Sequence, residues 1–323
     1  MARTSLAWPP MANSKQSPRA GGVYAALATP QRPDSTEADA AALLDYLDTV
    51  VRTGVDGLVL FGSTGEFVHF DVAERMRVVT LAIRRSRVPV LVNVSHSTLA
   101  GAIDLAEQAI EAGAAGVLGM PPYFYRYTDV QLLEFYRQLV RTVGGKTRIY
   151  LYNLPQFTNP LSAGLATHLL ESGDFAGIKD SSGDWQLYQT LRQVRERAPF
   201  ILMCGNEAIY LDCRAGGADG IVSGVAAAIP ELMVAMDRAI RANKQEMARQ
   251  LNGRLQEFVH WADKFPATIA IKQAAVSRGW KLNRFPFRFD DDTQADLAAF
   301  HHWLSDWIPA VLAECGSTTA VTA

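Results

Sequence analysis

A lysine closes an apolar run in the segment FAGIKDSSGDW, which spans Phe175 to Trp185. An amine held among apolar neighbours loses hydration, and this loss favours its neutral, nucleophilic form. Such an amine attacks a ketone to form an imine, whose positive nitrogen withdraws electrons from an adjacent C–C or C–H bond. Lys179 is therefore a candidate nucleophile. The structural alternative is a lysine that reaches solvent or pairs with Asp180.

A second candidate is the glycine-rich turn FGSTGEF, from Phe61 to Phe67. The N–H groups of Ser63 and Thr64, near an expected helix start, are suited to hold an anion such as a carboxylate. The turn lacks the GxxxxGK[ST] spacing of a nucleotide phosphate loop, so we do not expect it to bind nucleotide phosphates. We expect Glu66 to be a structural hydrogen-bonding group. The alternative is a polar turn in which Ser63 or Thr64 only caps a helix.

Aromatic residues stand at two further positions where strands are expected to end. Tyr152 lies in IYLYNLP. Its phenol is suited to relay protons, although a strand tyrosine is also typical of a core. The loop GMPPYFYRYT carries Tyr123, Phe124 and Tyr125. This cluster is suited to wall a pocket or to cross into a neighbouring subunit, with inert loop packing as the alternative.

A repeated unit indicates the elements that position these residues. TGVDGLVL, AGAAGVLGM and GGADGIVS each place two glycines three residues apart, the second opening an apolar run. The first glycine suits the left-handed position after a helix, and the second lets the chain enter a crowded strand. Capping-box spacing predicts where helices begin. The glycine pairs are Gly54 and Gly57, Gly113 and Gly116, and Gly217 and Gly220; the capping pairs are Thr36 and Asp39, Asp71 and Glu74, and Thr128 and Gln131.

Five more apolar runs, which begin at Val23, Val88, Arg148, Phe175 and Phe200, bring the strand count to about eight. Their continuous apolar character indicates parallel strands covered on both faces. Eight such strands close an α/β (β/α)8 TIM barrel, whose active site lies at the carboxyl ends of the strands. The absence of GxGxxG after the first strand disfavours an open doubly wound sheet. We expect a disordered tail at residues 1–20, the barrel at 21–230, a C-terminal helical extension at 231–315 and a flexible tail at 316–323.

Composition favours small-molecule chemistry. The formal net charge of -2 and the sequence pI near 6.3 give no electrostatic reason to expect binding to nucleic acid or to a membrane. Cys204, Cys213 and Cys315 lack CxxC spacing, so neither a disulfide framework nor a zinc site is indicated. No apolar run reaches the ~18 residues of a membrane helix, and the N-terminal segment lacks the apolar region of a secretory signal. We expect a cytoplasmic protein.

In combination, GSTGE, YN.P and GIKDSSGD resemble the dihydrodipicolinate synthase/N-acetylneuraminate lyase family of Schiff-base-forming barrels. This resemblance implies that Lys179 forms an imine with pyruvate or another 2-oxo acid and that Tyr152 relays protons. It also implies that Ser63 and Thr64 hold the carboxylate, and that the Thr64 hydroxyl links Tyr152 to a tyrosine lent by an adjacent subunit. The backbone carbonyl of Val222 is expected near the pyruvyl methyl group.

Two positions depart from the family pattern. The lent tyrosine aligns with Phe124, so a phenol is absent there unless Tyr125 or Tyr123 takes its place. Phe157 stands where the synthase branch carries an arginine for the second substrate's carboxylate. This substitution disfavours dihydrodipicolinate synthase activity and favours a less anionic partner.

These features predict a lyase that makes or breaks a C–C bond between pyruvate and an aldehyde. The imine nitrogen withdraws electrons as a metal would, so neither a metal nor a cofactor is expected. One alternative uses the same lysine to dehydrate a 2-oxo-3-deoxy sugar acid, and another is an inactive barrel that only binds 2-oxo acids. The second substrate is selected by loop side chains that include Gln156, Phe157, Ser181 and Ser223. The resemblance also implies a homotetramer.

Overall fold

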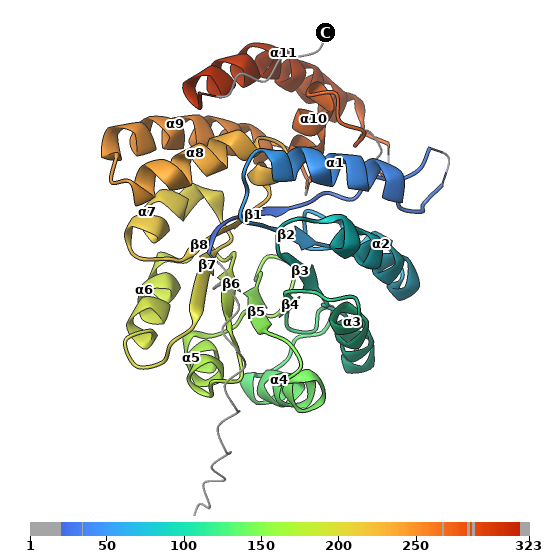
Figure 1. Cartoon of the computed structure of the whole chain (residues 1–323), viewed down its shortest axis with the longest axis vertical. Helices are drawn as coiled ribbons and strands as arrows, with labels where there is room; N and C mark the ends of the chain where they lie inside the picture. The colour runs from blue at the N-terminus through green and yellow to red at the C-terminus, as the bar shows by residue number, and fades with distance from the viewer. Residues whose placement is uncertain (1–20, 34, 267, 283–284, 286–287, 317–323) are drawn as a thin grey trace, which may run out of the picture.

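The fold is a closed barrel of eight parallel strands, as predicted. The computed structural model describes residues 21–33, 35–266, 268–282, 285 and 288–316. Each strand pairs with the next along the chain, and the eighth pairs with the first, which closes the barrel (Figure 1). The strands are β1 (Gly22–Ala26), β2 (Gly57–Leu60), β3 (Val90–Asn93), β4 (Gly116–Gly119), β5 (Ile149–Asn153), β6 (Gly177–Asp180), β7 (Ile201–Cys204) and β8 (Gly220–Ser223).

Eight helices follow the strands in turn and cover the outside of the barrel (Figure 1). Short 3-10 turns precede three of them, at η1 (Phe67–His69), η2 (Glu207–Ile209) and η3 (Val225–Ala227). The helices are α1 (Ala40–Arg52), α2 (Val72–Arg85), α3 (Leu99–Glu111), α4 (Asp129–Val143), α5 (Ala163–Glu171), α6 (Trp185–Val194), α7 (Tyr210–Ala215) and α8 (Pro230–Arg241).

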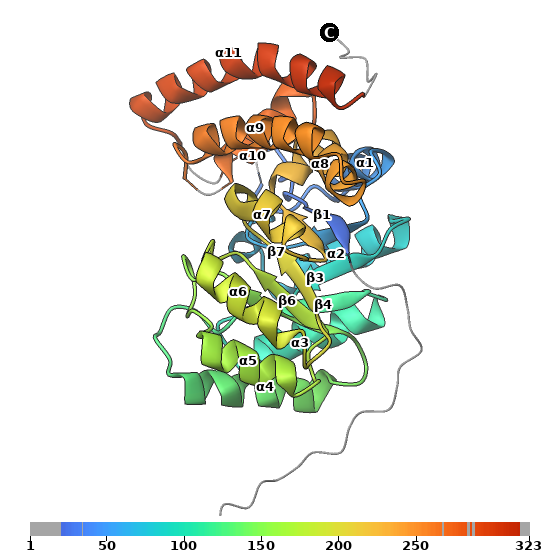
Figure 2. The ribbon, with the colours of Figure 1, turned by 90° about the vertical axis from the view of Figure 1, so that its left-hand side faces the viewer.

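Three further helices form a C-terminal layer on one side of the barrel. They are α9 (Gln245–Ala262), α10 (Ile269–Ser277) and α11 (Asp291–Glu314), and both ribbon views place them beside α8 (Figures 1 and 2). A buried ion pair fixes the end of α10, because the Arg278 guanidinium lies 2.6 Å from the Glu231 carboxylate of α8. The two predicted tails lie outside the described residues, apart from Gly316.

The repeated glycines occupy the positions that the sequence predicts. Gly54 and Gly217 have φ angles of 91° and 99°, in the left-handed region that favours glycine. A Cβ at Gly57 would lie 2.2 Å from the Tyr24 ring, and one at Gly220 would lie 2.0 Å from the carbonyl oxygen of Gly22. The second glycine of the repeat is therefore required by close packing where strands meet.

The predicted helix starts are correct in two of three places. Thr128 and Gln131 form a full capping box at α4, and Asp71 caps α2 by accepting from the N–H of Glu74. The prediction at Thr36 is wrong, because Asp39 is the residue that caps α1. An antiparallel bridge between Gln31 and Ala38 closes a bend at residues 35–37, so the helix begins later, at Ala40.

We predict that Gly220→Ala destabilises the barrel, because the added methyl group would overlap the backbone of Gly22 and neither strand can move aside. Overpacking of this kind costs about 2 kcal/mol or more of the free energy of unfolding, measurable by urea denaturation. The matched control is Gly253→Ala in α9, where a Cβ meets no atom within 4 Å. That change is expected to stabilise by roughly 0.5–1 kcal/mol. Equal effects at the two sites would contradict the packing argument.

Candidate active site

Lys179 lies at the carboxyl end of β6, inside the barrel, with 5% of its surface exposed. Strand pairing places it beside Tyr152 of β5, and its Nζ atom is 4.0 Å from the centroid of the Tyr152 ring. In the part of the chain that the structure describes, the Lys179 amine makes no hydrogen bond or ion pair. Because so little of its surface is exposed, the lysine does not reach bulk solvent as a surface lysine would.

Asp180 is not the partner of Lys179. Its carboxylate accepts hydrogen bonds from Asn153 Nδ2 at 2.7 Å and from Ser182 Oγ at 2.9 Å. Burial raises the pKa of Asp180, while these two hydrogen bonds oppose the rise. Neighbouring residues of a strand point to opposite faces, so Asp180 joins β5 to the loop after β6 while Lys179 faces inward.

The predicted site residues meet at one cavity of about 400 Å³ at the mouth of the barrel. Ser63, Thr64, Tyr152, Lys179, Val222 and Phe157 all line it. Tyr125 does not line the cavity and is 67% exposed in the loop after β4. The structure thus brings together six of these seven predicted site residues, with Gln156 and Ser181, and leaves Tyr125 and Ser223 outside the cavity lining.

Other cavity residues are absent from the site predicted from the sequence. Asn206 comes from the loop after β7 and Glu207 from the 3-10 turn η2, and Phe258, Thr268 and Ile271 come from α9 and the start of α10. Asn206 stands two residues after an apolar strand, and this position at a strand end could have indicated it. No local sequence pattern indicates that the residues of α9 and α10 line a cavity, because their position there depends on how the C-terminal layer packs.

The turn after β2 presents free hydrogen-bond donors to the cavity. Within the described residues, neither the N–H nor the hydroxyl of Ser63 or Thr64 makes a hydrogen bond, although both residues line the cavity. The turn itself is fixed from outside, since Thr29 Oγ1 donates to the Gly65 carbonyl at 2.8 Å and Asn93 Nδ2 donates to the Phe61 carbonyl at 2.7 Å. Rigid, unpaired N–H groups form an anion-binding concavity.

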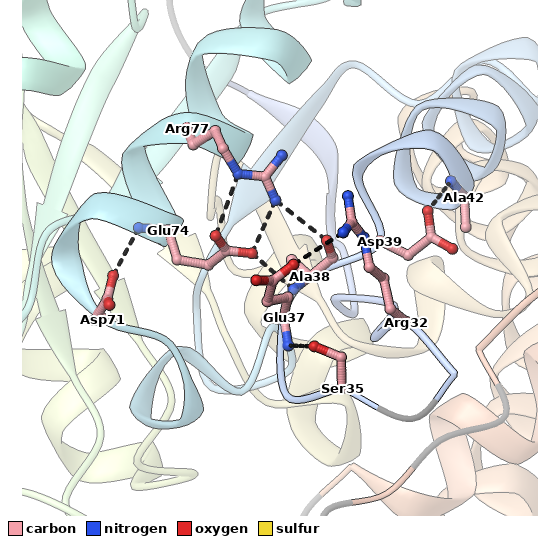
Figure 3. Close-up of polar contacts among 9 residues, drawn as sticks. All are labelled: Arg32, Ser35, Glu37, Ala38, Asp39, Ala42, Asp71, Glu74 and Arg77. Carbon is pink, nitrogen blue, oxygen red and sulfur yellow. Dashed lines mark hydrogen bonds and ion pairs between the residues drawn. The ribbon is translucent and has the colours of Figure 1, made fainter.

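The start of α2 anchors the loop after β1 (Figure 3). Glu74 accepts a hydrogen bond from the N–H of Ala38 at 2.7 Å, and Arg77 Nη2 lies 2.9 Å from the Glu74 carboxylate and 3.3 Å from the Ala38 carbonyl. The hydrogen bond from Arg77 lowers the pKa of Glu74. The N–H of Asp39 donates to the Pro30 carbonyl at 2.8 Å, so the anchored segment is tied to the neighbour of Thr29, which donates to the turn that holds Ser63 and Thr64.

Arg75, the next residue of α2, is a buried cation that the sequence analysis missed. Its guanidinium donates to the carbonyls of Asn93 at 2.6 Å and Ser95 at 3.2 Å, and it lies 5.1 Å from the centroid of the Phe67 ring. Burial lowers the pKa of Arg75 to about 10. Arg75 therefore joins the end of β3 to the segment after β2, and both support the anion-binding turn.

The three aromatic rings of the loop after β4 differ in their exposure and in their contacts. Phe124 is 87% exposed and has a φ angle of 85°, a left-handed conformation that costs roughly 1–3 kcal/mol for a residue with a side chain. Its ring contacts that of Tyr125 edge to face, with the centroids 5.0 Å apart. Tyr123 is half-buried, and its ring packs against Phe67 of the same chain.

Known proteins resemble this chain in sequence and in fold. The model of the dihydrodipicolinate synthetase family matches residues 19–294. A probable 2-dehydro-3-deoxy-D-pentonate aldolase of Escherichia coli, YjhH, is 32% identical over 247 residues, which cover 74% of this chain and 78% of the relative. A 4-hydroxy-tetrahydrodipicolinate synthase of Methanococcoides burtonii is 29% identical over 72% of this chain and 79% of the relative.

Among solved structures, the Escherichia coli protein YagE in complex with pyruvate is similar, with a TM-score of 0.81 and 25% identity over 88% of this chain and 98% of that chain. The chain belongs to the dihydrodipicolinate synthetase family and is a lyase.

Within the described residues, no group of three or more His, Cys, Asp or Glu side chains is placed to hold a metal ion. No helix in the same residues combines the length and the apolar character needed to cross a bilayer.

The hydroxyl of Ser181 gives a prediction about the cavity wall. Ser181 is 6% exposed, and its Oγ atom is buried without a hydrogen-bond partner in the described structure. We predict that Ser181→Ala leaves the thermal midpoint unchanged or raises it, because it removes an unsatisfied polar group. The matched control is Ser223→Ala, whose hydroxyl donates to Glu207 and accepts from the N–H of Ala226.

That control is expected to lose about 1 kcal/mol of the free energy of unfolding. A clear loss of stability in Ser181→Ala would show that its hydroxyl is satisfied within the protein. It would then be unavailable to a ligand.

Proposed function

We propose that the enzyme forms an imine between Lys179 and a 2-oxo acid and makes or breaks a C–C bond between pyruvate and an aldehyde. The observation that carries this proposal is the placement of Lys179. Its amine lies in a cavity beside the Tyr152 ring, and the unpaired donors of Ser63 and Thr64 line the same cavity. An amine and an anion-binding turn in one cavity suit a substrate that bears a carbonyl next to a carboxylate.

In the cleavage direction, the Lys179 amine attacks the keto carbon while the N–H groups of Ser63 and Thr64 hold the carboxylate. Loss of water then gives the iminium ion. Tyr152 takes the proton of the substrate hydroxyl on the carbon beyond the breaking bond, and the bond's electron pair passes to the iminium nitrogen. The aldehyde leaves, the enamine carbon regains a proton near the Val222 carbonyl, and hydrolysis releases pyruvate and the free lysine.

The cavity wall favours an uncharged, hydroxylated aldehyde as the second substrate. Gln156, Ser181 and Asn206 offer polar groups, whereas the cavity mouth carries the exposed ring of Phe157. A ring cannot pair with a second carboxylate, so the semialdehyde of a dihydrodipicolinate synthase is disfavoured. The named activity of the 32% identical relative, cleavage of a 2-dehydro-3-deoxy-pentonate, is of the favoured kind.

The assembly of subunits and the tyrosine lent by an adjacent subunit are part of the proposal. We expect a homotetramer in which the loop after β4 meets another subunit. Phe124 and Tyr125 are exposed there, whereas Tyr123 packs within its own chain. Tyr125 is thus the phenol available to a neighbouring site. Sedimentation velocity tests the assembly, and a monomer at micromolar concentration would contradict it.

The test of function is pyruvate release from a panel of 2-oxo-3-deoxy sugar acids, followed with lactate dehydrogenase and NADH. We predict turnover of at least one acid by the native enzyme and only the background rate for Lys179→Met, which removes the nucleophile. Aspartate semialdehyde with pyruvate should give no product. Mass spectrometry of the same reactions would reveal a dehydrated 2-oxo acid if the enzyme is a dehydratase. No product from any acid would favour the inactive, binding-only barrel.

A further inference from the structure

A buried ion pair joins the anion-binding turn to the C-terminal layer. Lys272 of α10 is fully buried, and its Nζ atom lies 2.7 Å from the carboxylate of Glu66, the residue that ends the GSTGE turn. Thr268 Oγ1 donates to the other oxygen of Glu66 at 3.0 Å. The reaction proposed above uses neither charge of this pair.

Glu66 belongs to the same turn as Ser63 and Thr64, the residues proposed to hold the substrate carboxylate. Its N–H donates to the Ser63 carbonyl at 3.0 Å, and its φ angle of 51° turns the chain in the left-handed region. Thr268, which donates to Glu66, itself lines the cavity. A largely buried carboxylate beside the cavity would repel a bound anion unless a cation neutralised it, because interactions between charges are weakly screened inside a protein.

Lys272 is held firmly in the position where it neutralises Glu66. Its Nζ atom lies 4.5 Å from the centroid of the Phe285 ring, an attractive cation–π contact. The end of the same helix is fixed by Arg278, which pairs with Glu231 and donates to the Ala228 carbonyl at 2.7 Å. Because a lone buried charge is costly, Lys272 and Glu66 depend on each other.

We propose that Lys272 is a positioning residue for the substrate carboxylate. Through its ion pair it cancels the negative charge of Glu66, so that Ser63 and Thr64 accept a 2-oxo acid in its ionised form. This inference rests on the proposed function, since it assumes that the turn holds the carboxylate of an imine-forming substrate. Helix α10 of the C-terminal layer thereby takes a direct part in substrate affinity.

The test compares a charged and a neutral ketone. Native protein and variants are incubated with increasing pyruvate, or with its neutral methyl ester, and reduced with borohydride. The fraction of modified protein in intact mass spectra gives the half-saturating concentration of each. The variants are Lys272→Met, Glu66→Gln and the double variant, with Lys244→Met as a control that removes one exposed lysine charge elsewhere.

For Lys272→Met we expect half-saturation by pyruvate to rise about tenfold, the size of a charge interaction in a partly buried site. Half-saturation by the methyl ester should change less than about threefold, because the ester carries no charge for Glu66 to repel. The double variant should recover most of the affinity for pyruvate. Glu66→Gln should bind pyruvate at least as well as the native protein. The double variant leaves no lone buried charge, so it keeps the test valid if a single variant does not fold.

Equal losses for pyruvate and its ester in Lys272→Met would overturn the inference, since they would indicate a general structural defect. An unchanged pyruvate affinity, a double variant no better than Lys272→Met, or a marked loss in Glu66→Gln would also overturn it. These results are distinct from failure of the proposed function. If the native protein itself forms no adduct with pyruvate, both the proposed function and the role of Lys272 are contradicted.

Discussion

A lysine amine buried beside a cavity, with no carboxylate partner in the described chain, is the feature on which the rest of the site depends. Closure of the barrel places Lys179 on the inner face of β6, next to Tyr152. The space for its side chain requires Gly205, because a Cβ there would lie 2.9 Å from Lys179 Cε. Asp180, the nearest carboxylate in sequence, is turned outward and engaged by Asn153. The fold thus keeps the amine apart from counter-ions and close to donors for an anion.

Segments distant in sequence hold the anion-binding turn in place. Glu74 and Arg75 of α2 secure the loop after β1 and the end of β3, while Lys272 reaches the turn from a helix 206 residues further along the chain. Each contact satisfies a buried polar group that would otherwise cost free energy. The C-terminal layer is therefore part of the cavity as well as a cover for the barrel. Thr268 and Ile271 line that cavity directly.

The sequence predicts the strands and the strand-end residues, because short-range patterns determine them. Apolar runs and repeated glycines place all eight strands, and strand ends locate Lys179, Tyr152 and the turn with Ser63 and Thr64. The Thr36 cap is wrong because the bridge between Gln31 and Ala38 bends the chain at this position and delays the helix start. The sequence does not predict the burial of Arg75 and Lys272, for a related reason. A cation in an amphipathic helix is usually solvated, and only tertiary packing decides that these two are buried.

The most direct measurement is the site of covalent modification after the protein is incubated with pyruvate and borohydride, digested and mapped by tandem mass spectrometry. The account predicts one reduced pyruvyl group, on the peptide that carries Lys179, and none in Lys179→Arg that is shown to fold. A peptide modified at another lysine, or no modification of the folded native protein, would contradict the assignment of Lys179 as the nucleophile and the mechanism built upon it.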